Sequence, residues 1–228
     1  AIETLGSATV LCTDKTGTLT ENRMSIVELR LADGLVLKVG EHPQPRFSAE
    51  FARLLRTGVL ASAQVPVDPM DRAFHALESQ YSPETAEPIS KAESLVHMYG
   101  LRPGLLAVSQ VWKTDADDRL VVAAKGAPEA ILRLCRTSAR RTAEVKRSID
   151  AMARQGIRVL GIARATTKTQ KLPNSPEAFK FEFLGLAGLA DPLREAVPRA
   201  VSQCQSAGIR VIMITGDYPA TARAIAAQ

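Results

Sequence analysis

Two short hydrophobic runs near the two ends of the chain are each followed by a polar loop. Ala8–Thr13 (ATVLCT) leads into the loop 14–20, and Ile209–Ile214 (IRVIMI) leads into Thr215–Asp217. Short apolar runs that are rich in β-favouring residues and stop at turn residues predict buried strands. Each strand would therefore present its polar loop at its carboxyl end.

A helix is predicted on each side of the second of these strands. The first covers Glu195–Ala207 and has Gly208 as its C-cap, and the second follows Asp217 with Pro219 in its first turn. The order strand, helix, strand with loops at the carboxyl ends predicts a parallel α/β sheet, in which ligands bind at those ends.

The middle of the chain has a different pattern. Strand-like runs are expected at Ile26–Leu31, Leu35–Val39, Leu105–Trp112, Arg119–Lys125, Arg158–Ala163 and Phe183–Ala190, and helices at about 51–60, 71–79, 128–135 and 142–155. Antiparallel strands with helices on one side predict an α+β domain that is inserted into the α/β domain. We expect residues 1–27 and 187–228 to form a discontinuous α/β domain and residues 28–186 to form the insert.

The composition narrows the classes of function. The chain has 228 residues, of which 46% are hydrophobic, and a net charge of +5 that is spread along it rather than clustered. Only 4% of the residues are aromatic, which leaves few platforms for stacking bases. We therefore expect no nucleic-acid partner. No apolar run reaches the roughly 18–20 residues of a membrane helix, and a chain that opens at Ala1 without a leader is expected to be an excised piece.

The loop Asp14–Thr20 (DKTGTLT) has the strongest chemical signature. A carboxylate on a tight loop after a strand can attack a phosphoryl group and form an aspartyl phosphate. Lys15 and the backbone amides of a loop with a glycine supply positive charge for the transferring group. A hydrolase would need a second acid two residues on to activate water, and Thr16 cannot serve as one. The expected acylphosphate should therefore persist.

This heptad resembles the phosphorylation signature of P-type cation-transporting ATPases. The resemblance implies that Asp14 is phosphorylated and that Mg²⁺ is held by its carboxylate and by the backbone carbonyl of Thr16, while the Thr16 hydroxyl contacts phosphate oxygens. It also implies a haloacid-dehalogenase-like phosphorylation domain, interrupted by a nucleotide-binding domain.

Three further segments of the insert are similar to motifs of this family that bind ATP. Lys125 and Gly126 open a KGAPE sequence, Asp71 lies in DPMDRA, and Arg158 lies in GIRVL. The resemblance implies that Asp71 contacts the adenine amino group and that Arg158 reaches the phosphates. Each has a structural alternative: a strand-to-helix turn for KGAPE, a helix N-terminal acid for Asp71, and a solvated strand-end residue for Arg158.

Two more segments match the family near the predicted parallel sheet. Asp191–Arg194 (DPLR) resembles the junction between the two domains, and Thr215, Gly216 and Asp217 match a TGD motif. A hydroxyl and backbone amides at a helix N-terminus form an anion site, although a capped strand-to-helix turn would look the same.

Two departures from the family pattern affect affinity and activity. The positions that hold an aromatic residue and a lysine around adenine in relatives are taken here by Leu101 and Leu106. Loss of stacking worth about 0.5–1.5 kcal/mol predicts weaker nucleotide binding. The downstream GDGxND segment, which supplies further magnesium carboxylates in the family, is absent from the sequence. We expect the chain by itself to phosphorylate Asp14 hardly at all.

The leading functional hypothesis is the cytosolic catalytic part of an ATP-driven cation pump. It would use ATP and Mg²⁺ and lie at the cytoplasmic face of a membrane. Its partners would be the transmembrane and actuator domains of the same pump, and the transported cation would bind elsewhere. One alternative is a soluble haloacid-dehalogenase-like phosphatase or phosphotransferase, which Thr16 disfavours. Another is a non-catalytic nucleotide-sensing module, which Leu101 and Leu106 leave open. The sequence does not identify the cation.

Overall fold

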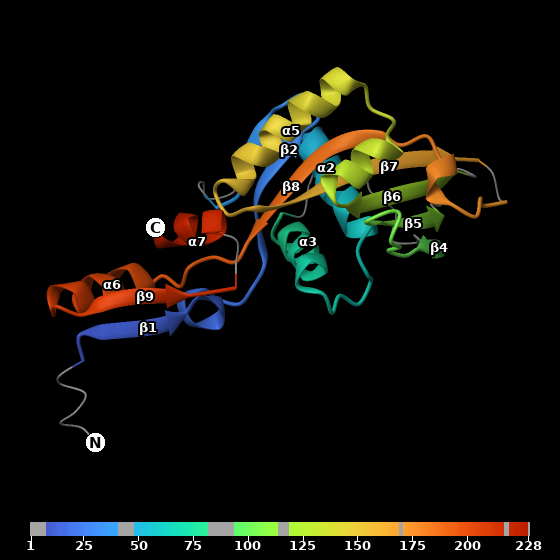
Figure 1. Cartoon of the computed structure of the whole chain (residues 1–228). Helices are drawn as coiled ribbons and strands as arrows, with labels where there is room; N and C mark the ends of the chain where they lie inside the picture. The colour runs from blue at the N-terminus through green and yellow to red at the C-terminus, as the bar shows by residue number, and fades with distance from the viewer. Residues whose placement is uncertain are drawn as a thin grey trace.

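The computed structural model describes residues 8–40, 48–81, 94–113, 119–168, 171–216 and 219–227. These residues form a two-stranded parallel sheet and a seven-stranded antiparallel sheet, each with helices packed on it (Figure 1). The combination of α/β and α+β parts that the sequence predicts is therefore present. Among these residues, none of the helices is long and apolar enough to cross a membrane.

The small sheet pairs β1 (Val10–Asp14) with β9 (Arg210–Ile214), and Asp14 lies opposite Ile214. Helix α6 (Val197–Ser206) packs on β9, and α7 (Pro219–Ala226) follows it in the chain. Gly208 lies just after α6 with a φ of +77°, the left-handed conformation that ends many helices. The strand, helix and parallel-strand order predicted from the sequence is confirmed.

The prediction that these two strands are buried is wrong for the described part of the chain. The exposed fraction is 42% for Val10, 45% for Leu11 and 57% for Ile214. A sheet of two strands has no central strand, and among the described helices only α6 makes extensive contact with β9. The apolar runs therefore form strands without being covered on both faces.

The large sheet has the strand order β3-β2-β8-β7-β6-β5-β4, and all its neighbours pair antiparallel. Its strands are β2 (Ser25–Leu31), β3 (Val36–Lys38), β4 (Ser94–Tyr99), β5 (Ala107–Lys113), β6 (Leu120–Gly126), β7 (Arg158–Thr167) and β8 (Glu182–Ala190). A short turn of helix, η2 (Pro176–Ala178), lies between the last two strands.

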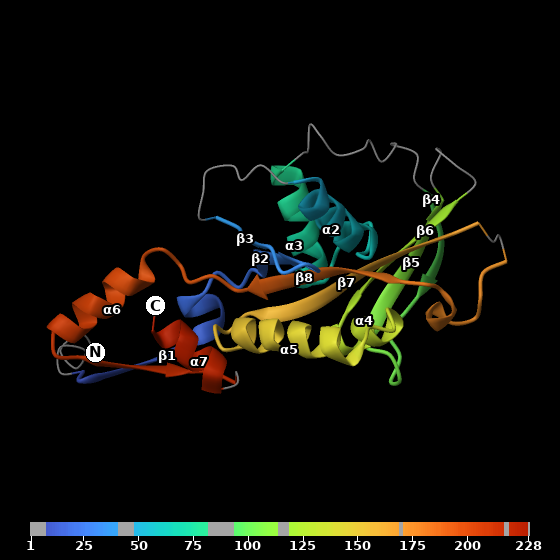
Figure 2. The same cartoon turned by 90° about the horizontal axis from the view of Figure 1, so that it is seen from above.

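Helices cover both faces of the large sheet, so the expectation of helices on one side is wrong. Figure 2 shows α2 (Ala49–Leu60) and α3 (Pro69–Gln80) on one face and α4 (Pro128–Leu134) and α5 (Ala139–Ala153) on the other. The burial of β6 explains the arrangement, because its first six residues are all buried. A strand that alternates sides can bury every residue only when both faces are covered.

The expected domain boundaries near residues 27 and 187 fall inside strands of the large sheet. Both β2 and β8 belong to this sheet over their full length, and Ser25 pairs with Ala190. The chain therefore passes between the two sheets at residues 20–24 and again at residues 191–196, a few residues outside the expected positions.

Candidate functional site

Asp14 lies at the carboxyl end of β1, at the same edge of the small sheet as the end of β9. Thr215 and Gly216 follow β9 directly and so emerge beside it, whereas Asp217 lies outside the described residues. Asp14 and Thr16 are exposed and Lys15 is buried. The strand end thus presents one carboxylate to solvent next to the loop that begins with Thr215, as the sequence predicts.

The residues after Asp14 form a single wide turn, η1 (Lys15–Leu19). Thr16 has an extended backbone, with φ −77° and ψ 120°, and Gly17 has a φ of +78°. That left-handed conformation favours glycine because a side chain would collide with the backbone. The turn is closed by the amide of Thr20, which donates to the carbonyl of Lys15 over 3.0 Å. Its shape therefore depends on the glycine of the motif.

The Asp191–Arg194 segment holds this turn in place from the second crossing between the sheets. The Thr20 hydroxyl donates to Asp191 Oδ2 over 2.6 Å, and the Arg23 amide donates to Asp191 Oδ1 over 3.0 Å. The Arg194 guanidinium donates to the carbonyl of Gly17 over 2.9 Å. Sequence reasoning identified the segment only as a junction, because no local pattern reveals a contact between residues 171 positions apart.

A second cluster forms where α3 meets the end of β6. Lys125 is only 6% exposed, and its Nζ donates to the Asp71 carboxylate and to the Ser62 hydroxyl. It also lies 4.9 Å from the centre of the Phe74 ring, within the range of a cation–π contact. Two residues that the sequence assigned to ATP binding from separate motifs are therefore in direct contact.

The first turn of α3 holds Asp71 in this position. Asp68 is the N-cap of the helix and accepts hydrogen bonds from the amides of Met70 and Asp71. Asp71 Oδ2 accepts from the amide of Ala63 over 2.9 Å, which leaves Oδ1 to Lys125. Burial lowers the pKa of Lys125, and the nearby charges of Asp71 and Asp68 oppose that shift. Removing the carboxylate would leave a buried ammonium without its counter-ion.

Gly126 is needed for the close approach of two strands. A Cβ at this position would lie 2.3 Å from the carbonyl oxygen of Leu106, which accepts a hydrogen bond from the amide of Ala127. The Leu106 side chain is 55% exposed, and Leu101 is 67% exposed. Large apolar side chains thus stand open to solvent in the segment that faces KGAPE across the strand pair.

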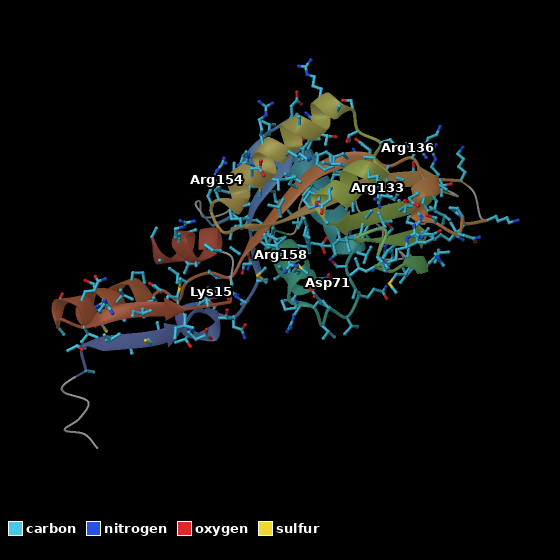
Figure 3. All side chains as sticks on the ribbon, in the orientation of Figure 1. Lys15, Asp71, Arg133, Arg136, Arg154 and Arg158 are labelled. Atoms are coloured by element: carbon cyan, nitrogen blue, oxygen red, sulfur yellow. The ribbon has the colours of Figure 1, made fainter. Side chains whose placement is uncertain are left out.

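Arg158 begins β7, opposite Leu189 at the end of β8, and it is exposed (Figure 3). Lys125 pairs with Ile162, four residues further along β7. Because alternate residues of a strand share a face, Arg158 lies on the same face as Lys125, at a distance of roughly 13 Å along the strand. The start of β7, at Arg158, lies beside the end of β8 and therefore near the crossing at Asp191, so Arg158 lies between the two clusters along the sheet.

The candidate metal ligands are two oxygen donors of the phosphorylation loop. Asp14 offers an exposed carboxylate, and Thr16 offers a backbone carbonyl in an extended conformation. Mg²⁺ usually binds one or two carboxylates and completes its shell with water and substrate phosphates, so this donor set fits part of such a shell. Among the described residues no group of three or more His, Cys, Asp or Glu side chains could hold a metal ion.

Comparison with known proteins gives two results. Residues 107–196 match the family profile described as "P-type ATPase, cytoplasmic domain N". The chain is 33% identical to sodium/potassium-transporting ATPase subunit alpha-2 of Pongo abelii over 99% of its length, and 32% identical to subunit alpha-A of Artemia franciscana over 100%. It spans about a quarter of these relatives, 26% and 27% of their respective lengths.

Proposed function

We propose that this chain, which is similar to P-type ATPase subunits along nearly its whole length and matches the profile of their cytoplasmic domain N at residues 107–196, is the ATP-binding and phosphate-accepting part of a cation pump. The observation that carries the proposal is the contact between Lys125 and Asp71. Two motifs that lie 54 residues apart in the sequence meet at one polar cluster, and Asp14 is exposed at a separate strand end.

The nucleotide would bind along the face of the large sheet that carries Lys125. Asp71 and Lys125 would contact the adenine, Gly126 and Leu101 would border it, and Arg158 would reach the phosphates. This assignment is supported by the exposure of Arg158 on the same face as Lys125, closer to the crossing between the sheets. The separation of Lys125 from Arg158 along this face suits an extended ligand whose adenine lies at Lys125 and whose phosphates lie near Arg158.

Asp14 would be the nucleophile for the γ-phosphate. Its carboxylate oxygen forms a bond to phosphorus while the bond to the leaving oxygen of ADP breaks, and the product is an aspartyl phosphate and ADP. Lys15, the Thr16 hydroxyl, and the hydroxyl and backbone amides of the loop at Thr215 and Gly216 would surround the transferred group with positive charge and hydrogen-bond donors. Asp217 would add a carboxylate near the nucleotide. Mg²⁺ bound at Asp14 and Thr16 would supply charge neutralisation for the phosphate oxygens.

Thr16 favours a stored intermediate over rapid hydrolysis, because a threonine hydroxyl cannot activate water as a carboxylate does. This residue supports a pump over a phosphatase of the haloacid-dehalogenase type. The small parallel sheet would then be part of a haloacid-dehalogenase-like phosphorylation domain, and the large sheet with its helices, between the two crossings, would be the nucleotide-binding insert. The transmembrane and actuator domains of such a pump would be its partners, at the cytoplasmic face of a membrane.

The test is phosphate transfer in the complete gene product that contains this chain. Incubation with γ-labelled ATP and Mg²⁺ should give an acid-stable label that hydroxylamine releases, since hydroxylamine cleaves acylphosphates. Asp14→Asn should abolish the label, and Asp33→Asn, which changes an exposed turn residue far from the site, should retain it. A label that survives in the Asp14→Asn variant, or no label in the unaltered protein, would overturn the proposal.

A further inference from the structure

Ser62 lies two residues after the end of α2 and is the other polar partner of Lys125. It is 1% exposed, and its hydroxyl donates to the carbonyl of Gly58 over 2.8 Å while accepting from Lys125 Nζ. A serine hydroxyl has one proton to donate and two lone pairs. The bond to Gly58 uses the proton, so the hydroxyl can only act as an acceptor toward the ammonium group.

Side chains of β5 fix the end of α2 against the sheet. The amide nitrogen of Gln110 donates to the carbonyl of Ser62 over 3.1 Å, and the indole of Trp112 donates to the carbonyl of Leu60 over 2.7 Å. These bonds satisfy carbonyls that a helix end leaves without partners. Gln110 is itself buried, and its Oε1 has no hydrogen-bond partner among the described residues. Ser62 is thus held at a defined position relative to β6.

The last turn of α2 also places the third neighbour of the ammonium group. A Cβ on Gly58 would lie 2.2 Å from the ring of Phe74, so only glycine lets this ring pack against the helix. The same ring lies under Lys125. The Lys125 ammonium group therefore has three neighbours, Ser62, Asp71 and the ring of Phe74, and two of the three depend on the end of α2.

We propose that Ser62 is a positioning residue for nucleotide recognition, which holds the Lys125 ammonium group beside Asp71 by accepting one of its hydrogen bonds. The proposal rests on the proposed function, because Lys125 would be the group that meets the nucleotide. Ser62 acts through the lysine and does not itself touch the ligand. It belongs to none of the motifs that point to ATP binding.

The charges around Lys125 determine what the loss of Ser62 should do. The charged groups that face it are Asp71, in the first turn of α3, and, further away, Asp68, the N-cap of that helix. The ring of His75 is hydrogen-bonded to the carbonyl of Ala63. Burial lowers the pKa of Lys125, and Asp71 raises it. An acceptor for the ammonium group acts in the same direction as Asp71, because it stabilises the charged form. Removing the hydroxyl should lower the pKa further.

The test is the pH dependence of Lys125 acylation by N-hydroxysuccinimidyl acetate, followed by peptide mass spectrometry in the absence of ATP. In Ser62→Ala the midpoint should fall by about one pH unit, a tenfold loss of proton affinity. Ser62→Thr, which keeps the hydroxyl, should restore it. Ser206→Ala is the matched control, because Ser206 makes the same bond to a carbonyl four residues earlier, over 2.9 Å, at the end of α6. It should leave the Lys125 midpoint unchanged.

A second variant keeps the test decisive if Ser62→Ala unfolds the chain. Ser62→Cys keeps the shape but has a weak acceptor, and it should shift the midpoint in the same direction. A midpoint equal to that of the unaltered protein in either folded variant would overturn the positioning role.

Repeating the acylation with ATP separates this proposal from the function on which it rests. ATP should protect Lys125 in the unaltered chain, and about tenfold more ATP should be needed in Ser62→Ala. If ATP protects the unaltered chain but the variant has the same midpoint and the same protection, only the positioning role fails. If ATP protects neither chain, nucleotide binding at Lys125 fails, and a shifted midpoint alone would still show that Ser62 acts on the lysine.

Discussion

The three cysteines of this chain differ in burial and therefore in how readily their thiols react. Burial, and to a lesser extent the charge of Glu182, raises the pKa of the Cys135 thiol from 9.0 to about 12. Cys12 is exposed on β1, and Cys204 is half-buried on α6. Because the thiolate is the reactive form, burial decides which of these residues can be alkylated.

We predict that iodoacetamide at pH 8 modifies Cys12 rapidly and Cys135 hardly at all. A rise in pKa from 9.0 to about 12 lowers the thiolate fraction by roughly a thousandfold at this pH. Peptide mass spectrometry over a time course measures both rates in one sample, and the ratio should approach unity in a denaturant. Equal rates in the folded chain would mean that Cys135 is not buried as described.

For single residues, the sequence predicts which side chains carry the chemistry of a site better than it predicts which of them are in contact. Asp71 and Lys125 were identified from separate motifs, and their direct contact follows from the fold. Ser62 and Gln110 were not identified, because a serine after a helix and a glutamine in a strand carry no chemical signature. The functional roles of all these residues stay predictions until ATP binding is measured.

Among the elements, the second crossing between the sheets stabilises the phosphorylation loop. Asp191 accepts from the Thr20 hydroxyl and from the Arg23 amide, so one carboxylate ties the loop to the start of β2. Thr20 is fully buried. Without Asp191 this hydroxyl would keep only the carbonyl of Lys15 as an acceptor, over 3.2 Å, and would exchange a hydrogen bond to a charged group for a longer one to a neutral group.

We predict that Asp191→Ala lowers the free energy of unfolding by about 1.5–3 kcal/mol, the usual range for a hydrogen bond to a charged group. Urea denaturation followed by circular dichroism measures the change. Asp33→Ala is the control, because Asp33 also accepts from a loop amide, that of Leu35, over 3.0 Å, but in an exposed turn. If the two variants lose the same stability, the Asp191 contacts do not stabilise the loop.

The helices and strands show which structural features a hydrophobic pattern can predict. The expected strands are present where short apolar runs end at turn residues, and the expected helices where apolar positions recur on one helical face. Strand β4 was missed because five of its six residues are exposed at the edge of the sheet, where little burial pattern exists. The covering of both faces of the large sheet was missed because a helical pattern does not identify the face on which a helix packs.

At the scale of the whole molecule, the two candidate clusters lie on different sheets. Asp14 ends a strand of the small sheet, whereas Lys125 and Asp71 lie on the large one, and the chain connects the sheets twice. Arg158 lies at the end of the large sheet next to the second crossing. A nucleotide anchored at Lys125 would extend its phosphates toward this end, which is the arrangement that transfer to Asp14 requires.

The most direct measurement is calorimetric titration of ATP into this chain and into two lysine variants. We predict binding with a dissociation constant weaker than about 1 μM, because Leu101 offers no aromatic ring for stacking. Lys125→Ala should weaken it at least tenfold, whereas Lys146→Ala, which removes an exposed lysine on α5, should have no effect. Absence of binding to the unaltered chain, or equal affinity in Lys125→Ala, would contradict the assignment of the nucleotide site.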